Sequence, residues 1–374
     1  MQIFHDRSLR EWNTFGMKVS CSCFVEYSSV EELKELWHGL HDFPSPFLHI
    51  GRGSNILFTK DFPGTIFHSG IRFIEVMPHP EAEAAPIPDR ETDEVQVEVG
   101  AGVTWDDFCG WCADRNLWGP ENLSGIPGET GAAAVQNIGA YGVEAKDIIR
   151  YVKCLDCVTG SMVTFKTSEC RYGYRESMFK TSAKGRYIVT SVIFALSRTS
   201  GPRLDYGHVR EAVETAVAGK DGRHDAEECT CGTDRQALTP ALVRDVILSV
   251  RDSKLPDPAV IGSAGSFFKN PVVPRSDYER IASIARIEHG EDFVVPHYDA
   301  GSGFIKVPAA WLIEQCGWKG HIEGNAGVYG KQPLVLTNAT GNASPDEIIA
   351  LENRIADSVM RKFGIALSPE VEHV

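Results

Sequence analysis

A glycine-rich segment at residues 123–142 constrains what this chain can fold into more than any other feature. It holds five glycines, and small alanines occupy positions 132–134. Such a stretch buries little side-chain area, but its backbone can approach a flat or phosphorylated molecule closely. We therefore expect a ligand cradle here. The alternative is a plain glycine-rich connection between strands.

A second glycine loop, Gly51-Arg52-Gly53-Ser54-Asn55, lies between two apolar stretches at 47–50 and 56–58. A Rossmann fingerprint requires a third glycine and a helix directly after it, and the sequence provides neither. The pattern instead predicts a strand, a tight turn and a further strand. Together the two glycine segments favour the binding of a dinucleotide.

Composition narrows the class of protein. The chain has 374 residues, 43% of them hydrophobic, so it is large enough for two or three domains with full cores. No apolar run approaches the ~18 residues of a membrane span, and the first residues do not resemble a signal peptide. We expect a cytoplasmic protein without membrane insertion. The net charge of −14 argues against nucleic-acid binding, which needs a basic face.

Ten cysteines raise the question of a metal site. Cys109 and Cys112 fall on one face of an expected helix, whereas Cys154 and Cys157 point to opposite faces of an expected strand. The two pairs are too far apart in the sequence for a compact zinc ribbon. We expect reduced thiols and no metal, and the pair at 229 and 231 has no comparable explanation.

Local patterns place the main elements. Helices are expected after Ser29, after Thr104, over 240–252 and after Ser344, and strands over 47–50, 95–99, 151–165 and 187–196. Residues 78–94 are expected to form an exposed loop, and residues 218–237 a surface insertion. Helices and strands mix without regular alternation, so the predicted class is α+β rather than a doubly wound sheet.

Three polar residues outside the glycine segments are candidates for chemistry. Ser266 precedes two phenylalanines and could supply a proton in a dry site, although a serine in a turn is the alternative. Arg175 has a guanidinium fork that suits a carboxylate or phosphate, and a surface ion pair is the alternative. Glu370 lies in an apolar tail, where a carboxyl group could act as an acid. The alternative for Glu370 is an exposed terminal charge.

Eight short motifs follow one another over residues 12–371, nearly the whole chain. They run from Trp12 to Gly16, Gly51 to Asn55, Gly125 to Gly128, Gln136 to Gly142, Tyr174 to Ser177, Lys254 to Pro256, Gly265 to Pro271 and Pro369 to Val371. Each motif is weak alone, but their order is specific. The pattern resembles the MurB family, the UDP-N-acetylenolpyruvoylglucosamine reductases.

The resemblance implies a peptidoglycan-synthesis enzyme that uses NADPH and non-covalent FAD to reduce UDP-N-acetylglucosamine enolpyruvate to UDP-N-acetylmuramate. It implies that Arg175 and Glu370 stabilise an enolate beside the substrate carboxylate, and that Ser266 protonates the adjacent carbon. The residues that it implies for the cofactor are Gly51, Gly53, Ser54, Asn55, Gly128, Gly131, Gln136, Asn137 and Gly139. Those for the UDP part are Tyr174, Tyr206, Lys254, Asn270 and Gln332, with Tyr206 favouring the type I members.

The resemblance also implies an architecture. We expect an FAD-binding fold of the vanillyl-alcohol-oxidase type with two subdomains, followed by a C-terminal α+β substrate domain. The expected domains are 1–70 with 368–374 returning to it, 71–205 and 206–367, in a monomeric protein. Two features depart from the family: the insertion at 218–237 is longer and more acidic, and Glu372 stands where Arg is frequent.

Two other functions are weighed against this one. An FAD oxidase of the same fold often attaches its flavin through His or Cys, and neither glycine segment contains these residues. A UDP-sugar-binding module without flavin would have no use for two complete glycine segments. Both alternatives are therefore less favoured than the reductase.

Overall fold

The computed structural model describes residues 1–78, 93–207, 209–221 and 238–374. They group into two compact units, and each unit is assembled from three separate segments. Unit one comprises Met1–Asp6, Ser22–Arg52 and Pro63–Ser253, and unit two comprises Arg7–Cys21, Gly53–Phe62 and Lys254–Val374. The predicted division into three domains stays a prediction.

The first sheet has four strands in the order β1-β2-β5-β3, and most of its residues belong to unit one. The strands are β1 Gln2–Ser8, β2 Ser20–Tyr27, β5 Phe62–Ser69 and β3 Phe47–Ile50. Helix α1 (Val30–His38) begins at Ser29, whose hydroxyl accepts the N–H of Glu32 at 3.1 Å. Its residues Leu33 and Leu36 pack into a core with residues of β2 and β5, so α1 covers this sheet.

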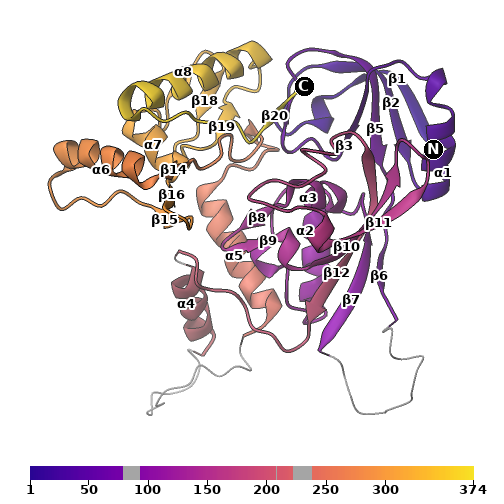
Figure 1. Ribbon diagram of the computed structural model, residues 1–374, viewed down its shortest axis with the longest axis horizontal. Coiled ribbons are helices and arrows are strands. Elements are labelled where there is room, and N and C mark those ends of the chain that lie inside the picture. Colours follow the sequence, from indigo (N-terminus) through magenta and orange to yellow (C-terminus); the bar gives the residue numbers. More distant parts are fainter. Residues whose placement is uncertain (79–92, 208, 222–237) are drawn as a thin grey trace. The chain divides into compact units, whose positions relative to one another are not determined.

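The second sheet of unit one is antiparallel and has the strand order β11-β10-β12-β7-β6. Its strands are β11 Met162–Lys166, β10 Ile149–Asp156, β12 Tyr187–Ser197, β7 Glu94–Gly100 and β6 Ile74–Val76. Helices α2 (Trp105–Ala113) and α3 (Thr130–Gln136) lie beside its central strands (Figure 1). Trp105, Phe108 and Phe194 pack ring against ring in the core beneath α2. This core fixes the position of the glycine-rich segment that follows α2.

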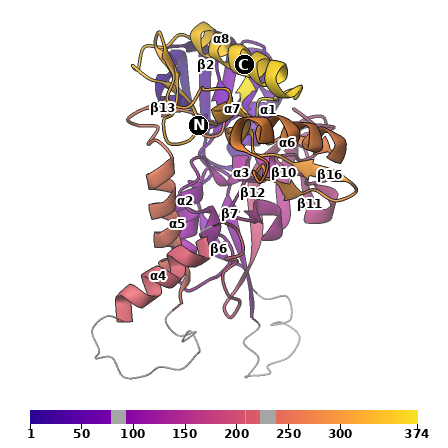
Figure 2. The same cartoon turned by 90° about the vertical axis from the view of Figure 1, so that its left-hand side faces the viewer.

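Two further helices complete unit one. Helix α5 (Pro240–Lys254) runs alongside α2 (Figure 2), and Arg244 of α5 pairs with Asp106 of α2. Helix α4 (Val209–Asp221) packs with α5 around Val213, Val243 and Ile247. The short elements of unit one are β8 Gly139–Ala140, β9 Val143–Glu144, η2 Leu40–Asp42, η3 Glu121–Leu123, η4 Ala145–Asp147 and η5 Thr167–Glu169.

Unit two combines three helices with short strands. The helices are α6 Arg275–His289, α7 Ala309–Gln315 and α8 Pro345–Phe363. One sheet has the order β13-β19-β18-β17, from Gly262–Ser263, Leu336–Asn338, Ala326–Val328 and Ile322–Glu323. The other has the order β14-β16-β15, from Val272–Pro274, Phe304–Lys306 and Tyr298–Asp299. Turn η1 (Arg10–Trp12) lies in the N-terminal segment of this unit.

The end of the chain returns to its N-terminal region within unit two. Strand β20 (Glu372–His373) pairs in parallel with β4 (Ile56–Leu57), directly after the first glycine loop. Thr59 completes the contact, since its N–H and its hydroxyl both donate to the carbonyl of Val374, at 2.7 and 2.8 Å. This strand pair brings the last residues of the chain beside the first glycine loop, and the predicted return of residues 368–374 to a domain of residues 1–70 stays a prediction.

The elements with local signals lie where the sequence places them. Helix α8 has the predicted capping box between Ser344 and Glu347, and it ends at Gly364 in the left-handed conformation. Two predictions were wrong. The single strand expected over 151–165 is a hairpin of β10 and β11, because Thr159 and Gly160 form a turn. The insertion expected from residue 218 begins inside α4, which ends at Asp221.

The glycine-rich segment also differs from the expectation that it buries little. Residues 130–136 form helix α3, in which Ala133 and Ala134 are buried against β12.

The expected loop at 78–94 lies largely outside the described residues, as do the rest of the insertion and Cys229 and Cys231. The other eight cysteines lie in the described ranges, where none of them is in a disulfide and most of them are buried.

Candidate active site

The first glycine loop has a backbone that only glycine can adopt at Gly53. Its φ is +64°, and a Cβ there would lie 2.0 Å from the carbonyl oxygen of Trp12. Gly51 closely approaches the second glycine segment, because its Cβ would lie 3.2 Å from Glu129 Oε2. Asn55 anchors the C-terminal tail: its Nδ2 donates to the carbonyl of Glu370 at 3.1 Å, and its own carbonyl accepts the N–H of Glu372. The loop is therefore built by close packing, as expected for a backbone cradle.

The second glycine segment surrounds α3. Gly128 has a φ of +125° and precedes the helix, and Asn137 ends the helix with a φ of +48°. Gly131 packs closely, since its Cβ would lie 2.8 Å from Ala101 Cβ, and its N–H donates to the carbonyl of Ala101. The side chain of Asn137 donates to Gly173 O at 2.8 Å and accepts the N–H of Lys146 at 3.0 Å. Both ends of this amide thus hold the segment in place, and a direct cofactor contact of Asn137 stays a prediction.

Arg175 lies against this same segment in unit one. Its guanidinium donates to the carbonyl of Gly139, and a Cβ on Gly139 would lie 2.6 Å from Arg175 Nη1. The ring of Tyr174 lies 5.2 Å from the guanidinium carbon, within cation–π range. The N–H and carbonyl groups of Gly173 and Glu176 pair across the turn that presents Arg175. The structure therefore brings together Arg175, Tyr174 and Gly139.

Lys180 extends this cluster, and no sequence signal identified it. Its ammonium group donates to Gln136 Oε1 at 2.5 Å and lies 3.4 Å from the carbonyl of Arg175. A positive charge so placed links a predicted cofactor residue to a predicted catalytic one.

Tyr206 packs against the turn of Tyr141 and Gly142, which connects β8 and β9. Its ring meets Tyr141 edge to face at 6.5 Å, and it closely approaches Gly142. Burial raises the pKa of Tyr141 above its ordinary value, while the positive charge of Arg251 opposes this rise. Arg251 lies on α5, and it is a second cation that the sequence motifs did not single out. An arginine one helical turn before Lys254 was the available signal, but arginines on helices are too common to interpret.

Ser266 and Glu370 lie on neighbouring segments of unit two. The N–H of Glu370 donates to the carbonyl of Phe267 at 2.7 Å, and Phe268 pairs with Pro369 in an isolated antiparallel bridge. Phe267 is fully buried, whereas Ser266 beside it is exposed. The backbones of Ser266 and Glu370 are thereby one residue out of register across a strand-like pair.

The predicted UDP-binding residues of unit two lie around the same strand pair. Asn270 follows it and accepts the N–H of Ala309, the first residue of α7, at 2.9 Å. Gln332 begins the turn that leads to Leu334, whose carbonyl accepts the N–H of Phe267. Lys254 is exposed at the end of α5. Asn270 and Gln332 are therefore near Ser266 along the backbone, while the assigned role of all three stays a prediction.

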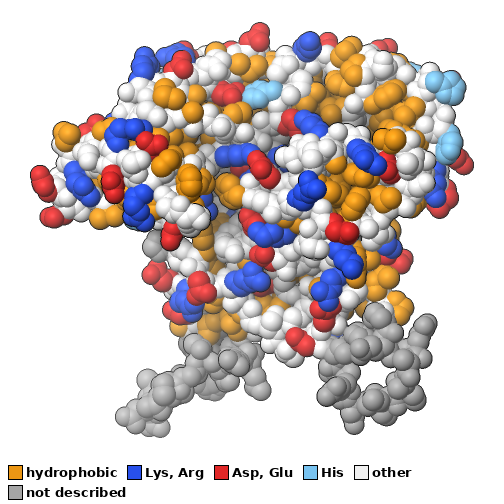
Figure 3. Space-filling view, in the orientation of Figure 1, with side chains coloured by type: hydrophobic (Ala, Val, Ile, Leu, Met, Phe, Trp, Pro, Cys, Tyr) orange, Lys and Arg blue, Asp and Glu red, His pale blue; other side chains and the backbone are white. Residues whose placement is uncertain are grey.

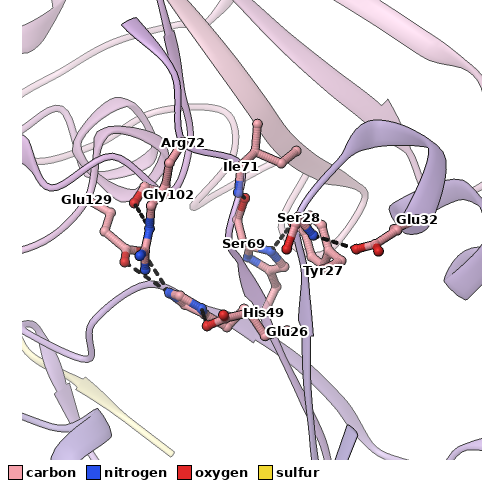
Figure 4. Close-up of polar contacts among 11 residues, drawn as sticks. Glu26, Tyr27, Ser28, Glu32, His49, Ser69, Ile71, Arg72, Gly102 and Glu129 are labelled. Carbon is pink, nitrogen blue, oxygen red and sulfur yellow. Dashed lines mark hydrogen bonds and ion pairs between the residues drawn. The ribbon is translucent and has the colours of Figure 1, made fainter. Parts of the chain in front are cut away.

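A group of three side chains, Glu26, His68 and Glu129, lies in unit one next to Gly51, and Figure 4 labels its two acids. The imidazole of His68 is fully buried, with Nδ1 at 2.8 Å from Glu26 Oε2 and Nε2 at 2.9 Å from Glu129 Oε1. Next to it, Tyr27 and His49 share a hydrogen bond of 2.6 Å. Burial lowers the pKa of His49 to about 3, and the neighbouring His68 adds to this effect. Sequence reasoning missed the group because Glu129 and His68 are 61 residues apart.

Acidic and basic side chains alternate over the face drawn in Figure 3 without one dominant basic field. Among the described residues, no cluster of His, Cys, Asp and Glu is arranged to hold a metal ion. No helix in the described ranges is both long and apolar enough to span a bilayer.

Comparison with known proteins assigns the class and then the family. Residues 21–166 match the FAD binding domain family, and with the two glycine loops they define a flavin-dependent oxidoreductase. Residues 257–374 match the C-terminal domain of UDP-N-acetylenolpyruvoylglucosamine reductase. The chain belongs to the UDP-N-acetylenolpyruvoylglucosamine reductase family, as its motifs indicated.

The relatives cover the whole chain. The reductase of Bacteroides fragilis strain YCH46 is 44% identical over 367 residues, 98% of either protein. That of Chromobacterium violaceum is 40% identical over 375 residues, covering 99% of this chain and 98% of the relative. The crystal structure of the Thermus caldophilus MurB enzyme has the same fold, with a TM-score of 0.59 at 19% identity over 100% of this chain and 98% of that one. The predicted α+β fold with an FAD-binding part is confirmed.

Proposed function

We propose that this protein uses NADPH and non-covalently bound FAD to reduce UDP-N-acetylglucosamine enolpyruvate to UDP-N-acetylmuramate, a step of peptidoglycan synthesis. The observation that carries the proposal is the hydrogen bond from Glu370 N–H to Phe267 O, because it brings the backbone of the tail that holds Glu370 next to the segment that holds Ser266 in a member of this family.

Two buried polar atoms beside the glycine loops support the binding of a dinucleotide there. Thr14 follows Asn13, which packs against Gly53 of the first loop, and Asn122 comes just before the second glycine segment. The two atoms of interest are Thr14 Oγ1 and Asn122 Oδ1. Both atoms are buried and lack a hydrogen-bond partner within the described ranges. Buried polar atoms of this kind are normally satisfied by a ligand or water. Residues Gly51, Gly53, Ser54, Asn55, Gly128, Gly131, Gln136, Asn137 and Gly139 would hold FAD, which supplies hydride transfer from NADPH to the vinyl ether.

The chain's own residues then manage charge and protons. Arg175 offers a fork of N–H donors to the substrate carboxylate, where negative charge grows as the enolate forms. The hydroxyl of Ser266 donates a proton to the carbon next to that carboxylate. Glu370, in its carboxylic-acid form, donates a hydrogen bond to the enolate. Tyr174, Tyr206, Lys254, Asn270 and Gln332 bind the UDP part.

The proposal is tested with Ser266→Ala in two half-reactions followed by stopped-flow absorbance of the flavin. Reduction by NADPH should stay near the wild-type rate. Reoxidation by the enolpyruvyl substrate should slow by roughly 10²–10⁴-fold, because a positioned acid contributes that much. Equal slowing of both steps, or a protein that takes up no FAD, would overturn the assignment.

We also propose that the protein works as a monomer in the cytoplasm. Light scattering after size exclusion tests the first statement, and cell fractionation tests the second. A dimeric mass, or recovery of the protein with the membrane fraction, would contradict them.

A further inference from the structure

The group formed by Glu26, His68 and Glu129 requires a shared proton. Both ring nitrogens of His68 face carboxylate oxygens, at 2.8 Å to Glu26 and at 2.9 and 3.1 Å to the two oxygens of Glu129. A neutral imidazole has only one N–H donor, so it can satisfy one carboxylate and not both. Either the ring carries two protons, or one of the carboxyl groups is protonated. In both cases the three groups together carry a net charge of −1 rather than −2.

The shared proton matters for ligand binding because Glu129 lies where the two glycine loops meet. Glu129 directly follows Gly128 and precedes the first residue of α3, so its carboxylate stands at the start of the second glycine segment. Its Oε2 also lies next to Gly51 of the first loop. Glu129 is buried, with His68 fully buried beside it, and water therefore screens its charge weakly. The proposed function places an anionic dinucleotide at these same two loops.

An unneutralised carboxylate at this junction would repel a diphosphate. The proton shared within the group removes that repulsion, and the contact of Glu26 with Nδ1 of His68 holds the ring with its Nε2 toward Glu129. Glu26 is the more exposed of the two acids, with 25% of its side chain accessible, so its charge is better solvated.

We propose that His68 is a positioning residue for FAD binding, which acts by neutralising Glu129 where the two glycine loops meet. This inference rests on the proposed function, since it assumes that FAD occupies these loops. On this proposal Glu129 does not bind the cofactor. His68 removes the repulsion that the Glu129 carboxylate would otherwise exert on FAD.

The test measures FAD affinity of the apoprotein by quenching of flavin fluorescence, which does not depend on turnover. His68→Gln keeps a polar side chain but cannot bind an extra proton, so its Kd for FAD should rise about tenfold or more. Glu129→Gln should bind FAD as tightly as the wild type or more tightly. The double variant should match Glu129→Gln, because no charge is left to neutralise. His41→Gln, at an exposed histidine of the same unit, serves as the matched control and should not change the Kd.

The outcomes separate this role from a purely mechanical one. If His68 only stabilises the local fold, His68→Gln weakens FAD binding by the same factor in the wild-type background and in the Glu129→Gln background. That result would overturn the proposal. A Kd of His68→Gln within threefold of the wild type also overturns it. Should His68→Gln not fold, Glu129→Gln decides alone, because a tenfold weaker Kd in that variant means that the carboxylate helps FAD. A wild-type protein that binds no FAD contradicts the proposed function itself.

Discussion

Arg175 adopts a backbone conformation that few arginines adopt. Its φ is +56°, in the left-handed region that favours glycine. A non-glycine residue held there costs on the order of 1–3 kcal/mol, and such residues cluster at ligand sites. The paired backbone groups of Gly173 and Glu176 hold this turn, and the contact with Gly139 orients the guanidinium. The sequence motif indicated the residue, but nothing in the sequence revealed its strained conformation.

Gly139→Ala tests the contact that orients Arg175. The new Cβ would meet Arg175 Nη1 at 2.6 Å and must displace the guanidinium. We expect kcat/KM for the enolpyruvyl substrate to fall by roughly 10²-fold, the effect of about 1 Å of misplacement. Flavin reduction by NADPH should fall less than reoxidation, because Arg175 is proposed to act on the substrate, even though Gly139 is itself proposed to hold FAD. Gly201→Ala, where an added Cβ meets nothing within 4 Å, is the control. Equal losses in both half-reactions would point to a general disturbance of the loop.

Tyr206→Phe tests the hydroxyl predicted to bind the diphosphate of the substrate. The variant keeps the edge-to-face contact with Tyr141, so the turn should remain in place. We expect a higher KM for the substrate with a smaller change in kcat, because the hydrogen bond exists in ground and transition states alike. The loss should be about 0.5–3 kcal/mol. Unchanged substrate affinity would argue that the type I assignment of Tyr206 is wrong.

At the scale of elements, strand β20 joins the segment that carries Glu370 to the rest of unit two. Its neighbour Val371 is buried, and His373 meets the ring of Phe267 edge to face at 6.0 Å. His373 Nε2 also lies 2.8 Å from Glu352 Oε2 of α8. The hydrogen bond to Glu352 raises the pKa of His373 above its ordinary value. The charged form of His373 therefore stabilises the folded protein.

The sign of this effect predicts a pH dependence. The stabilisation is fully present below the unfolded pKa, about 6.5, and is lost as the pH rises through the higher folded value. Glu352→Gln should therefore lower the free energy of unfolding by about 0.2–1 kcal/mol at acidic pH and hardly at all at alkaline pH. Urea unfolding at both pH values measures this, with Asp357→Asn on the same helix as control. A loss that is the same at both pH values would show that the ion pair is not the cause.

At the scale of the whole molecule, the sequence predicts the elements whose signals are local. Capping residues identify α1 and α8, and apolar periodicity identifies α5. Helix α3 escaped prediction because Ala133 and Ala134 have no apolar periodicity, and packing against β12 stabilises them instead. The turn between β10 and β11 had a local signal in Gly160, whose φ is +69°, and the prediction of a single strand over 151–165 overlooked it.

The residues of the candidate site also differ in how far the sequence could predict them. The residues Arg175, Ser266 and Glu370 followed from a family resemblance, since each alone had an ordinary explanation. The pairing of Phe267 with Glu370 and the group of Glu26, His68 and Glu129 depend on contacts between distant residues, which a single sequence does not encode locally.

The parallel pair of β4 and β20 sets an order of events during protein synthesis. Asn55 and Glu370 are 315 residues apart, yet the amide of one holds the carbonyl of the other. Ribosomes make roughly 5–20 residues per second, so β4 waits many seconds before its partner strand emerges from the exit tunnel. During that interval the unpaired edge of β4 is available to chaperones or to other strands. The last step of assembling unit two is thus also the step that delivers Glu370 to its place.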